Sequence, residues 1–273
     1  MATSQRISSK QIYEIQELVA RVMEVGHNPA HWRWLAIDGL KRMLQAQVGL
    51  TLDVRLTDHT PVMVDPIDVG WQTDSVRRRY GEYVESGEMA RDPGGTTWLA
   101  EHSKHRYVCR TRRELVDDRR WYGSASVSEA RKLGDVDDFV VSSIAIRPDA
   151  IHGIIIYRSW SEKCFERRHL RLLNLFHLQL ARADRVAQRR RQELVEKLPP
   201  RLQQTLEMLF SPLSLKEIAR ELGISRHTVN DYQKRLYERF EVTSRVELIY
   251  RLGPTSMRRL RFPSELGLED PLK

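Results

Sequence analysis

The hydrophobic residues at the start of the chain recur every three or four positions, which predicts two amphipathic helices. The first helix is expected over about 11–25, and the second after the break at Asn28-Pro29. Their apolar stripes consist of Ile12, Ile15, Val19 and Val22 in the first helix, and of Ile37, Leu40 and Leu44 in the second.

The hydrophobic period then changes to two, which is typical of a strand with one buried face. Apolar residues alternate with small or polar ones over 48–56, and Val62 and Val64 are expected on a hairpin partner. Two further runs, DFVVSSIAI and GIIIYRSW, flank the turn residues 147–149 and are predicted to pair as antiparallel strands. Residues 65–138 show no sustained period, so helices and loops are expected there.

The chain is predicted to become helical again from Phe165, and its charge density rises in the stretch AQRRRQELVEK. Pro199-Pro200 cannot continue that helix and therefore marks a domain boundary.

Four short helices are predicted over 199–252, because each stretch carries its own start or stop residue. Ser214 and Glu217 form a capping box for the second helix, and Gly223 ends it, since a residue without Cβ readily adopts a left-handed conformation. Ser225 caps the third helix, and Thr243-Ser244 the fourth. The apolar face of the third helix consists of Val229, Tyr232, Leu236 and Phe240.

Placing Val229 inward turns a polar face of the third helix outward, because successive helical side chains are about 100° apart. Asn pairs with adenine, Lys or Arg with guanine, and Asp accepts from cytosine, so this face suits the major groove of DNA. The candidates for reading bases are His227, Asn230, Asp231, Lys234 and Arg235. The candidates for phosphate contact lie near helix termini and are Lys216, Ser225, Arg226, Thr228, Arg239 and Arg245.

Composition agrees with a nucleic-acid partner. A chain of 273 residues favours two domains, and a net charge of +8 with 41% hydrophobic residues indicates a folded protein with a basic surface. No apolar run approaches the ~18 residues that span a bilayer, and no signal peptide is evident, so a cytoplasmic protein without a membrane partner is expected. The two cysteines, Cys109 and Cys164, exclude a disulfide framework and a Cys-based zinc site.

The stretch KEIARELGIS, the following Thr228-Val229 and the later SRVEL resemble, in order and spacing, the LuxR-type (GerE-like) helix-turn-helix family over 198–252. The resemblance implies that the third helix, Ser225–Phe240, enters the major groove and that the fourth supports pairing of two DNA-bound modules. Two positions depart from the family pattern. Arg201-Leu202 stands where an Arg-Glu pair is usual, and Tyr232 where a His is common.

The family resemblance implies a sequence-specific transcriptional regulator that binds double-stranded DNA. A homodimer is expected, because two half-sites are the usual way for small modules to reach specific affinity, and RNA polymerase is a possible further partner. A protein-interaction adaptor that keeps the same scaffold is the alternative, since capped four-helix modules also bind proteins.

Regulators of this family carry a receiver, an autoinducer-binding domain or another sensor. A receiver needs alternating βα units, which the predicted element order lacks. That order is similar to a PAS- or GAF-like sensor, in which helices flank an antiparallel sheet. A looser resemblance to autoinducer-binding domains rests on Tyr83, Asp92-Pro93, Trp121 and Gly134 but lacks the Trp expected before that Tyr, so an autoinducer-responsive regulator is a further alternative.

The predicted organisation is therefore an α+β, PAS/GAF-like sensor domain with an antiparallel sheet flanked by helices, followed by an all-α four-helix helix-turn-helix domain. The expected boundaries are 1–164 for the sensor, 165–197 for a closing helix and charged connector, 198–252 for the helix-turn-helix domain and 253–273 for a loosely ordered tail.

A small-molecule ligand in the N-terminal domain is possible, and its candidate contacts are Trp71, Tyr80, Trp98 and Trp121. Core packing is the commoner role for such aromatics. His102 and His105 lack a third ligand, so no metal site is expected. No phosphate loop, Gly-x-Ser-x-Gly, zincin or dinucleotide motif is present, so neither an enzyme nor a cofactor is expected.

Overall fold

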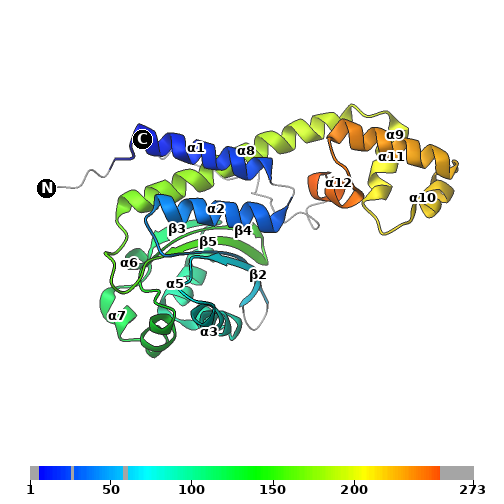
Figure 1. Ribbon diagram of the computed structural model, residues 1–273. Coiled ribbons are helices and arrows are strands. Elements are labelled where there is room, and N and C mark those ends of the chain that lie inside the picture. Colours follow the sequence, from blue (N-terminus) through cyan, green and yellow to red (C-terminus); the bar gives the residue numbers. More distant parts are fainter. Residues whose placement is uncertain (1–5, 26–27, 58–60, 253–273) are drawn as a thin grey trace. The chain divides into compact units, whose positions relative to one another are not determined.

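The computed structural model describes residues 6–25, 28–57 and 61–252 and divides into two compact units. The first unit contains an antiparallel sheet flanked by helices, and the second, from residue 182 onward, is helical (Figure 1). Each unit has its own cluster of buried hydrophobic residues. The fold class predicted from hydrophobic periodicity is confirmed.

The first unit contains α1 (Ser9–Glu24), α2 (Pro29–Met43), β1 (Val48–Leu56), β2 (Pro61–Val69), α3 (Asp74–Glu85), α4 (Glu88–Arg91), α5 (Pro93–His102), β3 (Tyr107–Thr111), α6 (Arg112–Leu115), α7 (Asp118–Tyr122), a π-helix η1 (Val127–Arg131), β4 (Phe139–Arg147) and β5 (Ala150–Tyr157). Helix α8 (Arg167–Glu196) begins in this unit and continues into the second. The second unit then holds α9 (Pro200–Leu209), α10 (Leu215–Leu222), α11 (Arg226–Phe240) and α12 (Arg245–Leu252).

The sheet has the strand order β2-β1-β5-β4-β3, and every neighbouring pair is antiparallel. Both predicted hairpins are present, β1 with β2 and β4 with β5. Strand β1 lies between β2 and β5, with Leu50 opposite Asp68 on one side and Ile155 on the other.

Alternation along the strands sorts side chains onto two faces. Val48, Leu50 and Leu52 of β1 join the hydrophobic cluster on the face covered by α3 to α7. Asp53 points to the opposite face, where Arg33 of α2 binds it. Helix α2 and the first part of α8 cover that opposite face, and α1 lies farther from the sheet than α2 (Figure 1).

Buried polar groups lie between the sheet and this second helical layer. His152 Nδ1 is 2.8 Å from Asp53, and Arg33 donates to the other Asp53 oxygen at 2.7 Å. Burial opposes ionisation of Asp53, but the hydrogen bond and charge of His152, together with Arg33, lower its pKa to about 2. His177 of α8 lies 2.5 Å from the Ser142 hydroxyl, and burial lowers the pKa of this histidine to about 3.

Strand β3 was not predicted, because helices and loops were expected over 65–138. It buries the consecutive residues Val108 and Cys109 and so shows no period of two. The bounds of α3 to α7 and of η1 were not predicted either, because that stretch shows no sustained hydrophobic period. The division between the units falls inside α8, within the connector predicted at 165–197. The tail predicted over 253–273 lies outside the described residues.

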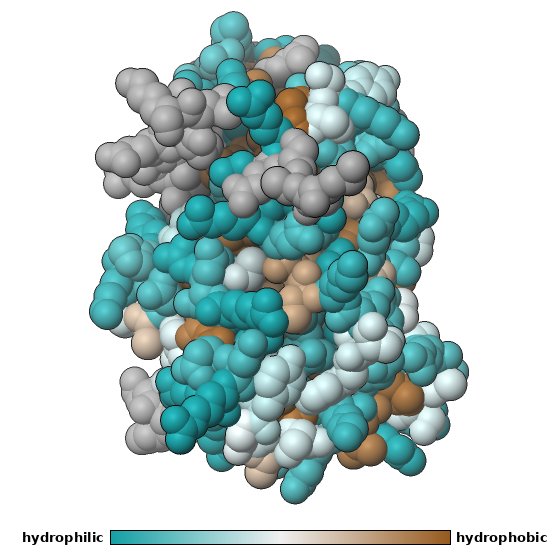
Figure 2. Space-filling model, turned by 90° about the vertical axis from the view of Figure 1, so that its left-hand side faces the viewer, coloured by the Kyte–Doolittle hydropathy of each residue, from teal (hydrophilic) through white to brown (hydrophobic). Residues whose placement is uncertain are grey.

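Hydrophilic side chains predominate on the face of the molecule shown in Figure 2, where hydrophobic ones form small separate groups. Within the described ranges, no helix is both long and apolar enough to cross a membrane.

Candidate functional site

The turn between α10 and α11 is fixed by side chains that cap both helices. The Ser214 hydroxyl accepts from the Glu217 N–H at 3.3 Å, while the Glu217 carboxylate accepts from the Ser214 N–H at 2.7 Å. Gly223 follows with φ of 62°, and the Ser225 hydroxyl accepts from the Thr228 N–H at 3.1 Å. These bonds satisfy N–H groups that a helix start leaves unpaired, so the predicted caps are confirmed.

Helix α11 is anchored through one apolar stripe. Val229, Leu236 and Phe240 are buried in the hydrophobic cluster that α11 shares with α9 and α10. Tyr232, which was predicted on the same stripe, is half-buried. Because the stripe fixes the rotation of α11, the opposite side of the helix faces solvent.

The predicted base-reading residues lie on this solvent-facing side of α11. His227, Lys234 and Arg235 are exposed, whereas Asn230 and Asp231 are half-buried. His227 Nε2 lies 3.6 Å from the Asp231 carboxylate one turn further on. The side chains of Asn230, Lys234 and Arg235 make no hydrogen bond or ion pair with other residues in the part of the chain that the structure describes. Their polar groups are therefore available to an external partner.

Lys216, Arg226 and Arg239 of the predicted phosphate set are also exposed. The Ser225 and Thr228 hydroxyls lie 2.9 Å apart within the N-terminal cap of α11. Arg226 and Thr228 thus lie in the first turn of α11 and Arg239 in its last turn, whereas Lys216 lies in the first turn of α10.

Arg245 does not fit the predicted phosphate set. Its guanidinium donates to the carbonyl oxygens of Leu209 at 2.8 Å, Leu213 at 2.7 Å and Ser211 at 2.6 Å, with a longer bond of 3.4 Å to Met208. Arg245 thus joins the start of α12 to carbonyl oxygens at the end of α9 and in the loop that follows it. We therefore assign it a folding role, because each of its three guanidinium nitrogens already donates to a backbone carbonyl.

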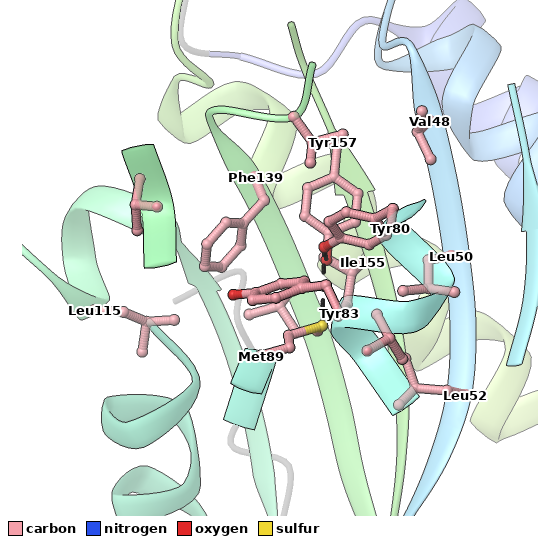
Figure 3. Packing of buried hydrophobic residues seen from close by; sticks show 14 of the residues in the cluster. Val48, Leu50, Leu52, Tyr80, Tyr83, Met89, Leu115, Phe139, Ile155 and Tyr157 are labelled. Carbon is pink, nitrogen blue, oxygen red and sulfur yellow. Dashed lines mark hydrogen bonds between the residues drawn. The ribbon is translucent and has the colours of Figure 1, made fainter. Parts of the chain in front are cut away.

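The first unit contains a cavity of about 40 Å³ between the sheet and helices α4 and α5. Leu52, Val54 and Ile155 line it from the sheet, and Met63 and Met89 lie beside them. Figure 3 shows part of this region, where Met89, Phe139 and Tyr157 approach one another in front of the sheet. Such a lining accommodates apolar groups.

A buried ion pair borders the cavity. Arg131 Nη2 lies 2.7 Å from the Asp92 carboxylate, and the two side chains are 2% and 0% exposed. The Tyr83 hydroxyl donates to the same carboxylate oxygen at 2.8 Å, and the Gly95 N–H donates to the other at 2.7 Å. Burial and the charge of Asp92 raise the pKa of Tyr83, although the charge of Arg131 opposes this shift.

A second tyrosine adjoins the pair. The Tyr80 hydroxyl lies 3.0 Å from the Tyr157 hydroxyl, and Figure 3 shows the two side chains facing each other. Burial raises the pKa of Tyr80 well above its usual value and also raises the pKa of Tyr157. Both groups therefore remain uncharged at neutral pH.

The four predicted ligand-contact aromatics divide into two groups. Trp98 lines the cavity, and its indole N–H donates to the Ser143 hydroxyl at 2.7 Å. Trp121 and Tyr80 are almost fully buried in the hydrophobic cluster, and Trp71 packs on Tyr80 with ring centroids 4.8 Å apart. The cavity lining includes only Trp98 of the four.

His102, one of two histidines considered for a metal, lies 2.7 Å from the Ser143 hydroxyl, and burial lowers its pKa to about 4. His105 is exposed. No group of three or more His, Cys, Asp or Glu side chains is placed to hold a metal ion within the described ranges.

Sequence reasoning missed Arg131 as a residue of the site. Arg131 pairs with a partner 39 positions away, so no local pattern marks it. It lies in a charged stretch whose residues resemble an ordinary solvated surface.

Comparison with known proteins identifies the second unit. Residues 196–252 match the family model described as bacterial regulatory proteins, luxR family. Among curated proteins, none matches the chain.

Three solved structures are similar to the chain at low identity. SdiA in complex with octanoyl-rac-glycerol is 13% identical, with a TM-score of 0.46 over 94% of this chain and 100% of the other. The LBD domain of VqsR from Pseudomonas aeruginosa is 15% identical, with a TM-score of 0.44 over 59% of this chain and 87% of the other. Escherichia coli SdiA is 13% identical, with a TM-score of 0.40 over 88% of this chain and 96% of the other.

Proposed function

Residues 196–252 form a LuxR-family helix-turn-helix domain, and from that premise we propose that the chain is a sequence-specific transcriptional regulator. It binds double-stranded DNA through α11 and a small molecule through the cavity of its first unit. The observation that carries the DNA-binding part is the solvent-facing side of α11. The polar groups of Asn230, Lys234 and Arg235 are available there to a partner, on a helix whose N-terminus is capped by Ser225.

Helix α11 lies in the major groove with this side against the base edges. Asn230 and Lys234 contribute direct readout, because an amide pairs with adenine and an ammonium with guanine acceptors. Asp231 accepts from cytosine, while His227 and Arg235 contact neighbouring bases. Lys216, Arg226 and Arg239 contact phosphates, together with the hydroxyls of Ser225 and Thr228 at the N-terminus of α11.

Two copies occupy two half-sites, since one module of this size buries a limited interface with DNA. Val246 of α12 is 63% exposed, which supports a contact between two DNA-bound modules on this helix. In this account the DNA-bound dimer acts on RNA polymerase and performs no catalysis.

The ligand-binding part is supported by the cavity in the first unit. Its sheet side is lined by apolar residues, and Arg131 is the charged residue in its lining. This combination of an apolar lining with few polar groups is characteristic of small-molecule sites.

Fluorescence anisotropy of the full chain on labelled random duplexes, at about 50 and about 200 mM salt, tests the DNA-binding part. Binding should weaken steeply at the higher salt concentration, because phosphate contacts release counterions. Lys216→Gln should weaken binding to every duplex alike. Lys104→Gln is the matched control, since Lys104 is also exposed but lies in the first unit, and this variant should bind like the parent.

Absence of binding, or binding that does not change with salt, would contradict the DNA-binding part. That result would favour the alternative, a protein-interaction adaptor built on the same helices.

A further inference from the structure

Arg131 holds a hydrogen-bond donor that no described residue accepts. Its Nε and Nη2 contact Asp92 at 2.8 and 2.7 Å, but Nη1 is buried and has no hydrogen-bond partner among the described residues. A buried donor left without a partner costs about 1–3 kcal/mol. The Nη1 position therefore lacks an acceptor.

The surroundings of Arg131 are aromatic. Its guanidinium carbon lies 4.8 Å from the ring centroid of Trp121, 5.4 Å from that of Phe139 and 5.7 Å from that of Tyr157. Aromatic faces attract a cation but do not replace a lone-pair acceptor. Arg131, Phe139 and Tyr157 also line the cavity, whose accessible surface is apolar, so an acceptor reaches the guanidinium only when the surrounding side chains rearrange.

Asp92 has no capacity left for a ligand. An ionised carboxylate accepts about four hydrogen bonds, and Asp92 already has contacts from the Gly95 N–H, the Tyr83 hydroxyl and two nitrogens of Arg131. Its negative charge is matched by Arg131. A second carboxylate, brought in by a ligand, would be an unmatched charge in an apolar cavity, which is strongly unfavourable.

We propose that Arg131 selects the ligand of this cavity, and that the ligand is an uncharged, largely apolar molecule whose polar end carries a hydrogen-bond acceptor and no donor, such as a ketone or ester. This inference rests on the proposed ligand-binding function of the first unit and adds the ligand class. The acceptor binds Arg131 Nη1, and the hydrocarbon part lies against Leu52 and Ile155.

The cavity has to expand for such a ligand, because about 40 Å³ holds only a few atoms. Met63 and Met89 provide the means. Both line the cavity, and unbranched methionine side chains rearrange readily around an apolar guest.

Two probes of the same shape test the proposal on the parent protein. They are 2-heptanone and 2-methyl-1-heptene, in which a CH₂ group replaces the carbonyl oxygen. Their dissociation constants are measured by ligand-observed NMR titration of the full chain in sealed tubes. The ketone should bind about tenfold more tightly, which is roughly the contribution of one hydrogen bond from a charged donor. Heptanoate, which adds a negative charge, should bind at least about tenfold more weakly than the ketone.

A variant that removes both charges assigns the preference to Arg131. In Arg131→Met/Asp92→Asn, the asparagine oxygen can still accept from the Gly95 N–H, and no buried charge is left unpaired. The ketone and the alkene should then bind this variant within about threefold of each other. Comparing the two ligands on the parent and on the variant isolates the contribution of the contact with Arg131. Arg131→Lys, which keeps the charge but loses the planar guanidinium, should give an intermediate preference.

Equal binding of ketone and alkene to the parent would overturn the ligand class while leaving ligand binding intact. A ketone preference that persists without Arg131 would overturn its role in selection. If none of the three probes bound the parent, both this inference and the ligand-binding part of the proposed function would be wrong, whereas DNA binding is measured separately.

Discussion

Arg131 and Asp92 lie 39 residues apart in sequence and form an ion pair at 2.7 Å in which both side chains are almost completely buried. The pair joins the end of η1 to Asp92, whose side chain caps α5, and so it organises one wall of the cavity. A buried ion pair adds little stability by itself, but loss of one partner strands a charge in the interior.

Arg131→Met should therefore lower the free energy of unfolding of the first unit by about 3–5 kcal/mol. Arg131→Met/Asp92→Asn should lower it by less, since no charge is stranded. Urea denaturation followed by tryptophan fluorescence measures this, because all six tryptophans lie in the first unit. Arg106→Met, at an exposed position, is the control and should leave the midpoint unchanged. Equal losses in the single and paired variants would contradict the account.

Arg245→Met should destabilise the second unit by about 2–4 kcal/mol, because carbonyl oxygens at the end of α9 lose their charged donor. Arg239→Met provides the contrast. This exposed residue should leave stability unchanged and weaken DNA binding more at low salt than at high salt. Hydrogen–deuterium exchange over α9 to α12 and anisotropy on duplex DNA distinguish the two roles. If the Arg245 variant exchanged hydrogen at the same rate as the parent but bound DNA more weakly, Arg245 would contact phosphate as first predicted.

Gly223→Ala should lower the stability of the second unit by about 1–2 kcal/mol, because φ is 62° there and a Cβ disfavours that conformation. The cost is conformational, since a Cβ at Gly223 would meet no atom within 4 Å. Gly81→Ala is the matched control. It also has open space but lies inside α3, so it should stabilise by about 0.5–1 kcal/mol. Thermal unfolding followed by circular dichroism should show shifts of opposite sign.

Acid should destabilise the first unit in two steps. The pKa of His177 is lowered from 6.5 to about 3 in the folded protein. As the pH falls below about 6.5, this imidazole takes up a proton in the unfolded chain but not in the folded one, so the stability of the fold decreases. Its contribution is about 1.4 kcal/mol per pH unit in that window. The pKa of Asp53 is lowered from 3.8 to about 2, so its stabilisation is lost only below about pH 4.

Urea midpoints at pH 7 and pH 5 separate the histidine step from the Asp53 step. His177→Gln should reduce the difference between these midpoints, whereas His105→Gln, at an exposed position, should not. A parent protein equally stable at both pH values would rule out the buried, uncharged histidine.

Features set by neighbouring residues were predictable from the sequence. The caps at Ser214 and Ser225, the turn at Gly223 and the stripe of α11 all depend on residues within a few positions of one another, and the structure contains each of them. The two hairpins were predictable for the same reason, because each consists of two β-like runs that are close together in sequence.

Features that depend on distant contacts were not predictable. Asp53 meets His152 across 99 positions, and Arg245 reaches Leu209 across 36. In the sequence, neither Asp53 nor Arg245 can be distinguished from a solvated charged residue, because its partner is distant along the chain. The aromatic residues illustrate the same limit, since the sequence suggested Trp71, Tyr80, Trp98 and Trp121 equally, and only packing separates Trp98 as the one that lines the cavity.

In vitro selection of duplexes from a random pool, with the full chain and its Asn230→Ala variant, tests most directly whether the solvent-facing side of α11 reads DNA. The parent should enrich one sequence with two related half-sites, and the variant should lose preference at one base position in each half-site while it retains the rest. If the parent enriched no sequence, or if Asn230→Ala enriched the same sequence with unchanged preference at every position, the assignment of Asn230 on α11 to base readout would be contradicted.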